Sequence, residues 1–197
     1  LQLNLPVTSV RDFEVYGNDL IVATHGRGFW VIDDISPLRQ VNATVLASDA
    51  HLFKPADAIL YSQGGDNGTP TQKDEPQALN PAEGAYLDYY LKPGVTGPIT
   101  LDVMDVSGAV VRSFAPPTTT PPSVPPASDR IPNTSPLWRP APAPFSTAAG
   151  MHRVAFLPGG GGGRGGGGGR GGRGGGGGDP PQTTGTFTAK LTVGGKS

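Results

Sequence analysis

The sequence predicts an all-β protein, and three observations lead to this fold class. The first is a run of three short apolar stretches within residues 9–32, separated by turn-forming residues as in an antiparallel meander. The second is an alternation of apolar and polar residues over 85–114, 150–156 and 186–193, which is typical of strands with one buried face. The third is that no stretch keeps a helical period over three turns.

Residues 1–40 predict a single β-propeller blade. A lead strand over residues 9–16 is followed by two more strands, residues 20–23 and 29–32, joined by the turn His-Gly-Arg-Gly at 25–28. The last two strands are apolar on consecutive residues, so we expect other protein to cover both of their faces, as in a blade stacked between neighbouring blades. Because a propeller needs at least about four blades to close, we expect this chain to be part of a larger protein.

Residues 85–197 predict an immunoglobulin-like β-sandwich, reached through a connecting segment and loop at 41–84. The sequence predicts five alternating strands with turn signals between them, whereas such a sandwich normally has about seven strands. In the last strand, the alternation places Leu191 in the core and Thr192 on the solvent face. The glycine pair at 194–195 predicts a turn into a further strand, so we expect the sandwich to be incomplete at its C-terminal end.

Two low-complexity insertions, residues 115–146 and 157–183, interrupt the predicted sandwich. The first is rich in Pro, and the second contains residues 159–178, which consist of Gly and three Arg. Such tracts have few apolar side chains to offset the entropy lost on ordering. We therefore expect both insertions to be disordered, and long polar loops of this kind add little to the entropic cost of closure.

The composition excludes several classes of protein. With no Cys, the chain has neither disulfides nor thiolate metal sites. No apolar run reaches the roughly 18 residues of a membrane span. The chain begins at Leu1, without an initiator Met or a basic signal-type segment. We expect the natural N-terminus, with any export signal, to lie upstream.

Four segments of the chain, residues 19–34, 80–91, 149–154 and 185–196, carry a family resemblance. They read Asp-Leu-Ile-Val-Ala-Thr-His-Gly-Arg-Gly-Phe-Trp-Val-Ile-Asp-Asp, then Asn-Pro with Gly-Ala-Tyr-Leu-Asp-Tyr-Tyr-Leu, then Ala-Gly-Met-His-Arg-Val, and last Gly-Thr-Phe-Thr-Ala-Lys-Leu-Thr-Val-Gly-Gly-Lys. In this order they resemble the C-terminal region of large bacterial BNR-repeat, sortilin-like β-propeller proteins, often labelled glycosyl hydrolases. The resemblance implies an exported, extracellular or periplasmic protein, in which an immunoglobulin-like domain follows a propeller array.

The chain also departs from this family. The strand that contains Gly-Met-His-Arg-Val continues in the family into a Trp-Asp-Leu-Arg-like stretch, whereas here residues 155–158 are Ala-Phe-Leu-Pro and precede the polyglycine run. The Asp box of the Ser-x-Asp-x-Gly-x-Thr-Trp type is absent from the sequence, as is the arginine cluster of a sialidase-like site. The resemblance therefore does not carry catalysis onto this chain.

The sequence predicts no catalytic, cofactor-binding or metal site. Glycosidases need two carboxyl groups about 5 to 9.5 Å apart across one bond, but Asp33 and Asp34, like Asp102 and Asp105, are expected on opposite faces of a strand. We expect Asp33 or Asp34 to cap the turn before the Ser-Pro pair at 36–37. The three His are far apart and lack metal-ligand spacing.

Three arginines, Arg164, Arg170 and Arg173, are the candidates for polyanion binding. They lie in an Arg-only stretch, residues 130–178, that contains no Asp or Glu, and such a stretch attracts polyanions. The tract lacks the interleaved aromatic residues that stack on bases, and three charges give a weak salt dependence. We interpret it as a solvated loop insertion, and we do not expect nucleic acid to be a partner.

The hypothesis from the sequence is a non-catalytic structural or interaction module at the C-terminal end of an exported propeller protein. Its expected partners are the upstream blades of the same protein, together with a protein or glycan ligand. One alternative is that the full-length parent is a glycoside hydrolase whose active site lies in upstream propeller sequence. A second alternative is weak binding of RNA or another polyanion by the Gly/Arg tract.

Overall fold

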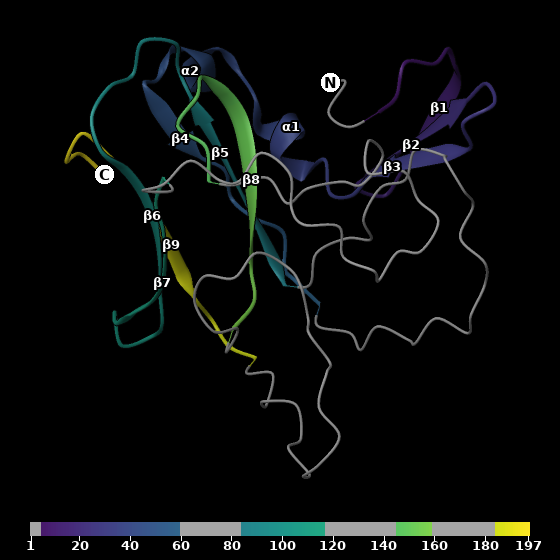
Figure 1. The fold of residues 1–197 in the computed structure, drawn as a ribbon. Helices are drawn as coiled ribbons and strands as arrows, with labels where there is room; N and C mark the ends of the chain where they lie inside the picture. The colour runs from purple at the N-terminus through teal and green to yellow at the C-terminus, as the bar shows by residue number, and fades with distance from the viewer. Residues whose placement is uncertain (1–4, 60–83, 117–144, 159–183) are drawn as a thin grey trace, which may run out of the picture. The chain divides into compact units, whose positions relative to one another are not determined.

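The computed structural model describes residues 5–59, 84–116, 145–158 and 184–197, and these fall into two compact units (Figure 1). The first unit contains residues 5–40 of the described chain, and the second contains all the other described residues. Within the described residues the structure is mostly strands in three antiparallel sheets, so the all-β prediction is confirmed. Most of the predicted insertions, residues 60–83 of the predicted connecting segment and loop, and all three candidate arginines lie outside the described residues.

The first unit is a three-stranded antiparallel meander in the order β1-β2-β3. Its strands are β1 (Val10–Tyr16), β2 (Asp19–Thr24) and β3 (Phe29–Ile32). They match the three stretches that the sequence predicted. A bulge between Val10 and Asp12 shifts the register of β1 on β2, which is the usual effect of one extra residue in an antiparallel pair.

The turn between β2 and β3 is built by glycine. Gly26 and Gly28 have φ values of 77° and 69°, a region open to glycine at little cost. The turn closes through Thr24, whose N–H and hydroxyl both donate to the Gly28 carbonyl at 3.1 and 2.7 Å. The Trp30 Nε1–H also donates to the Arg27 carbonyl at 2.9 Å. The prediction of a turn at this motif is therefore confirmed.

The second unit contains two three-stranded antiparallel sheets, in the orders β4-β5-β8 and β7-β6-β9. Their elements are α2 (Ala43–Ala47), β4 (Ala50–Leu52), β5 (Ala85–Leu91), β6 (Ile99–Met104), β7 (Val110–Phe114), β8 (Gly150–Phe156) and β9 (Thr188–Val193). The central strands β5 and β6 each pair on both sides. The two sheets form separate layers in Figure 1.

One apolar core joins these two sheets. β6 alternates buried and half-buried residues along its whole length, which is the period of a strand with one covered face. The buried members of the core are Leu87, Tyr89, Leu91, Ile99, Leu101, Val103, Phe145, Val154 and Phe156. From β9, Ala189, Leu191 and Val193 pack against this core, so the predicted inward face of β9 is confirmed. Leu191 is only half-buried, because β9 is an edge strand.

We expect the connecting segment to cross in an extended form over residues 41–61, but it begins with a short helix. This helix is α2, and another one-turn helix, α1 (Ser36–Gln40), ends the first unit; each has five residues. Asn42 caps α2, accepting the Val45 N–H at 3.0 Å. Helices this short have no periodicity that a sequence pattern can reveal. β4, which follows, pairs with β5 and thus belongs to the second unit.

Tyr89 connects the residues before β8 to the centre of β5. Its side chain is fully buried, and its ring stacks on Phe145 at 5.2 Å between centroids. The Tyr89 hydroxyl donates to the Ser146 carbonyl at 2.7 Å and accepts the Ser146 N–H at 3.0 Å. One side chain therefore satisfies both backbone groups of Ser146, and burial raises the pKa of the Tyr89 hydroxyl while the bond to Ser146 lowers it in part.

Replacing Leu101 with Ala should cost more stability than replacing Leu191, which lies directly opposite it on β9. Leu101 is completely buried, so its replacement should cost about 2–5 kcal/mol. Leu191→Ala should cost less, because the Leu191 side chain is already partly open to solvent. The exposed Thr188→Ala is the control and should stay within about 0.5 kcal/mol. Urea unfolding of the three variants measures these differences, and a larger loss for Leu191→Ala would contradict the burial order.

Tyr89→Phe should lower the free energy of unfolding at neutral pH by about 1–2 kcal/mol, since it removes both hydrogen bonds to Ser146. The raised pKa of Tyr89 also makes the wild type pH-sensitive. The contribution of the Tyr89 hydroxyl to the free energy of unfolding is complete below the ordinary tyrosine pKa of about 10. It is lost as the pH rises from there through the higher pKa of the folded state. The stability gap between wild type and variant should therefore narrow in alkaline solution, and a gap that widens in urea melts would overturn this assignment.

Candidate functional site

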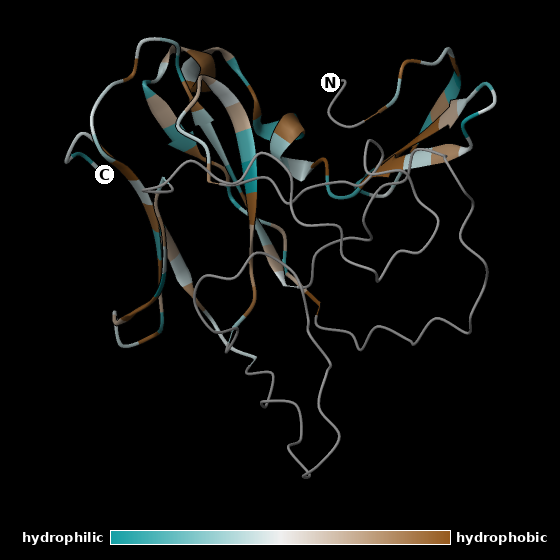
Figure 2. Ribbon diagram, in the orientation of Figure 1, coloured by the Kyte–Doolittle hydropathy of each residue, from teal (hydrophilic) through white to brown (hydrophobic). Residues whose placement is uncertain are grey.

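The sheet of the first unit presents apolar side chains on both of its faces. The registers of β1, β2 and β3 place Phe13, Val22 and Trp30 in one row across the sheet. Neighbouring residues of a strand face opposite ways. Phe29 and Val31 therefore lie on the face opposite to Trp30. Figure 2 shows the hydrophobic colouring along these strands.

These side chains remain in contact with solvent. Phe13 is 68% exposed and Phe29 77% exposed, and every residue of β1 is exposed. A three-stranded sheet gains its independent stability from a hydrophobic face packed against another layer. Contiguous exposed apolar surface of this kind is typical of sites that bind protein, membrane or other ligands. This double-faced sheet is the first candidate site.

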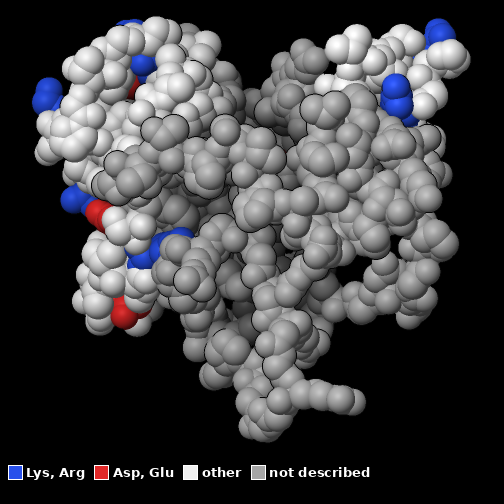
Figure 3. Space-filling model, viewed as in Figure 1, with Lys and Arg blue, Asp and Glu red and all other residues white. Residues whose placement is uncertain are grey.

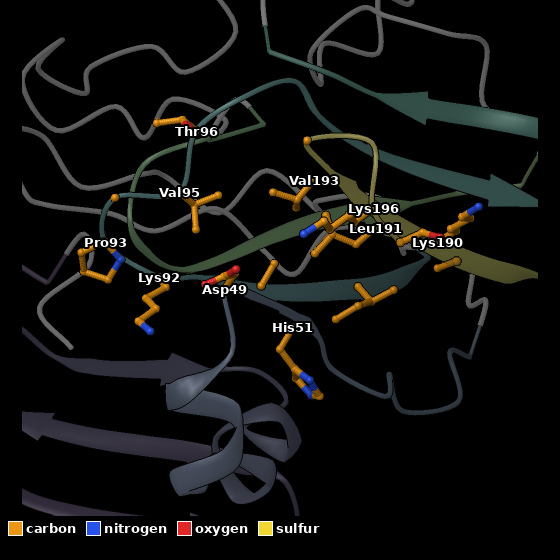
Figure 4. A pocket seen from close by; sticks show the side chains of 16 residues that line it. Asp49, His51, Lys92, Pro93, Val95, Thr96, Lys190, Leu191, Val193 and Lys196 are labelled. Atoms are coloured by element: carbon orange, nitrogen blue, oxygen red, sulfur yellow. The ribbon is translucent and has the colours of Figure 1, made fainter.

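A groove of about 920 Å³ in the second unit is the other candidate site. It lies where β4 and β9, the edge strands of the two sheets, approach each other. Its lining combines three parts of the chain: residues 49–52 around β4, the loop 92–96, and β9 with the residues that follow it. Figure 4 shows the side chains of the loop and of β9 on opposite sides of this pocket.

The groove carries more basic than acidic side chains. Lys92, Lys190 and Lys196 line it together with His51, while Asp49 is the acidic side chain among its lining residues. The Lys92 ammonium donates to the Ala47 carbonyl at 3.2 Å. In the close-up, Lys92 and Lys190 lie at opposite ends of the pocket (Figure 4). The groove therefore favours a ligand that combines apolar surface with negative charge.

The carboxylates that the sequence singled out occupy turns and strand pairs. Asp34 accepts the Ser36 N–H at 3.0 Å, which confirms the expected cap before the Ser-Pro pair. Asp105 accepts from the Ser107 N–H and hydroxyl and from the Ala109 N–H, and the Ser107 hydroxyl holds its pKa below the usual range. The Asp102 carboxylate accepts the Ser113 hydroxyl across the β6–β7 pair. These contacts give the three carboxylates structural roles.

Among the described residues, the buried carboxylate is that of Asp88, which the sequence analysis did not single out. It forms an ion pair with Arg153 on the neighbouring strand β8, with 2.9 Å between Oδ1 and Nε. The Arg153 guanidinium also lies 4.5 Å from the centre of the Tyr86 ring, close enough for a cation–π contact. Cross-strand pairing in the β5–β8 sheet accounts for this cluster. No group of three or more His, Asp or Glu suited to a metal ion occurs within the described part of the chain.

The polyanion candidates Arg164, Arg170 and Arg173 lie outside the described residues. On the face drawn in Figure 3, the described Lys and Arg side chains stand apart from one another. A nucleic-acid surface usually gathers them into a patch or stripe. The described surface in this view therefore adds no support for the RNA alternative.

The groove was missed by the sequence analysis because its walls come from segments distant in the sequence. The residues of β4 and those of β9 are separated by more than a hundred positions, and their approach depends on the packing of two sheets. The one available signal was the glycine pair that follows β9, which predicted a turn back along that strand. This turn lies at the groove.

The chain matches no protein-family model, no curated protein and no solved structure. Among the described residues, no helix is both long and apolar enough to cross a membrane. The resemblance to BNR-repeat, sortilin-like proteins accordingly depends on the four sequence segments alone.

We predict that this chain does not hydrolyse aryl glycosides. The described carboxylates above are engaged in turns, in strand pairs or with Arg153, whereas glycoside hydrolysis needs an acid and a second carboxylate free to face one bond. Colorimetric assays with a panel of nitrophenyl glycosides measure the activity. Turnover that disappears on changing Asp33 to Asn or Glu83 to Gln, and persists in Asp57→Asn as the control, would overturn the prediction.

Proposed function

We propose that this chain is a non-catalytic structural and interaction module, the C-terminal portion of an exported propeller protein of the BNR-repeat, sortilin-like type. Its first unit is a blade-type sheet that packs against neighbouring blades. Its second unit is an immunoglobulin-like domain that binds a protein or glycan. The observation that carries the proposal is the three-stranded meander with apolar side chains exposed on both faces.

A blade position explains the double-faced sheet. An isolated sheet with one solvent face alternates apolar and polar residues, whereas residues 20–23 and 29–32 are apolar throughout. Blades of a propeller are stacked radially, so each internal blade is covered on two sides. Upstream blades of the same protein are therefore the partner that fits this sheet.

The strand order of the second unit supports the immunoglobulin-like part of the proposal. In such domains strands A, B and E share one sheet, while C and F share the other, which strand C′ extends in the variable type. The observed orders β4-β5-β8 and β7-β6-β9 correspond to A-B-E and C′-C-F, with the strands met in the same sequence along the chain. Strands D and G have no counterpart among the described residues.

The sequence upstream of Leu1 in the gene provides the direct test. The proposal expects further meanders of the same kind, each with strands that are apolar on consecutive residues, and a secretory signal ahead of them. Paired acids and an arginine cluster within those blades would favour the glycoside hydrolase alternative for the parent. An upstream sequence of helical repeats, or one without propeller repeats, would refute the blade assignment.

Exposed apolar side chains of the first unit should bind the hydrophobic dye ANS. Replacing Phe13 and Phe29 with Ser should reduce ANS fluorescence strongly, because both rings are largely exposed in the described structure. The free energy of unfolding of the second unit, measured in urea, should stay within about 0.5 kcal/mol of the wild-type value, as for other surface changes. Ser113→Ala on the exposed part of β7 is the control. Unchanged dye fluorescence in the double variant would contradict an open apolar sheet.

A further inference from the structure

The two faces of the β1-β2-β3 sheet carry different side chains. Residues directly opposite each other in an antiparallel pair lie on the same face of the sheet, so the strand registers assign each paired residue to one face. On the first face, two rows cross all three strands and are wholly apolar. We call it the apolar face, and its rows are Phe13, Val22 and Trp30, and Val15, Leu20 and Ile32.

The opposite face combines carboxylates with open apolar surface, and we call it the acidic face. Its rows are Asp12, Ala23 and Phe29, and Glu14, Ile21 and Val31. β1 therefore contributes acidic side chains to this face, whereas β2 and β3 contribute apolar ones. Phe29 and Val31 are at least half exposed, and both carboxylates lie on the exposed strand β1.

The two carboxylates limit what can cover the acidic face. Within the described part of the chain, neither Asp12 nor Glu14 forms an ion pair, and Asp12 accepts the neighbouring Phe13 N–H at 2.8 Å. A layer that spans the three strands and buries Phe29 and Val31 also shields these carboxylates from water. Because burial of an unpaired charge is costly, the covering layer needs cationic side chains over β1.

A second copy of this sheet does not meet that requirement through the same face. The rows of the acidic face contain no Lys or Arg. Stacking β1 on β1 of the copy would bring carboxylates toward carboxylates, which repel each other. Stacking β1 on β3 of the copy would place the carboxylates over Phe29 and Val31, where they have no cation. The complementary layer therefore has a different composition from this sheet.

We infer that the acidic face binds a neighbouring blade of the same protein that presents Lys or Arg to β1 and apolar side chains to β2 and β3. The inference rests on the proposed function and adds the chemistry of the partner. Blades repeat radially around a propeller, so corresponding strands of two neighbouring blades lie near each other. The cations are therefore expected on the first strand of the neighbouring meander, at alternate positions.

The first test uses the full chain and two matched probes, a naphthalene that carries a trimethylammonium group and a naphthalene sulfonate. The cationic probe should shift the methyl NMR signals of Ile21 and Val31, on the acidic face, more than those of Leu20 and Val22, on the apolar face. The sulfonate should show the opposite preference. Equal shifts on the two faces with the cationic probe would overturn the inference.

Charge variants test the role of the carboxylates. Asp12→Asn combined with Glu14→Gln should weaken binding of the cationic probe about threefold to tenfold, and added salt should weaken its binding to the wild type. Asp57→Asn, in the second unit, is the control and should leave the affinity unchanged. Thermal melts establish that each variant is folded. An unchanged affinity in the double variant would overturn the inference.

The upstream coding sequence separates this inference from the proposed function. The inference expects an upstream meander whose first strand carries Lys or Arg at alternate positions. Upstream meanders that all lack such cations would refute the inference and leave the blade assignment in place. An upstream sequence without propeller repeats would refute the blade assignment and, with it, the blade as the partner, whereas the preference of the acidic face for the cationic probe would still hold.

Discussion

The second unit depends on the packing of β5 against β6 across one apolar core. Each of these strands is the centre of its own three-stranded sheet, and each has its apolar residues on the face turned to the other sheet. Leu101 and Tyr89 are completely buried there. Since burial of apolar surface is the main favourable term in folding, the four outer strands are held in place by this central pair.

Sheets of only three described strands leave most of their strands at a sheet edge. With three strands in a sheet, two are at an edge and expose half of their backbone groups, which invites pairing with another chain. β7 carries the charged Arg112, and charged side chains on an edge strand oppose edge-to-edge association. At β9, the hairpin turn between Val193 and Lys196 directs the following backbone along the outer side of the strand. The chain therefore treats these two edges differently, with a charged side chain at β7 and a hairpin turn at β9.

The sequence was sufficient to predict the strands but not their spatial neighbours. Period-two alternation identified β5, β6, β8 and β9 because a half-buried strand repeats every second residue whatever its partner. Pairing between distant strands leaves no local mark, so neither the Asp88–Arg153 pair nor the groove beside β9 could be predicted. Likewise α1 and α2 are shorter than two turns and give no period. Local rules thus predicted turns such as the cap at Asp34, whereas the candidate sites required the tertiary structure.

The two units differ in how far their apolar side chains are buried. In the second unit, each sheet buries one face against the other, and the polar residues of the alternating pattern meet solvent. In the first unit, the turn residues, the cap at Asp34 and the ladder of β2 are all satisfied, yet the apolar side chains of β1 and β3 are not covered. Hydrogen bonds alone contribute little net stability to such a sheet, and two faces rather than one are open. A covering layer on each side would supply further apolar burial, and the proposed blade position depends on this feature of the meander.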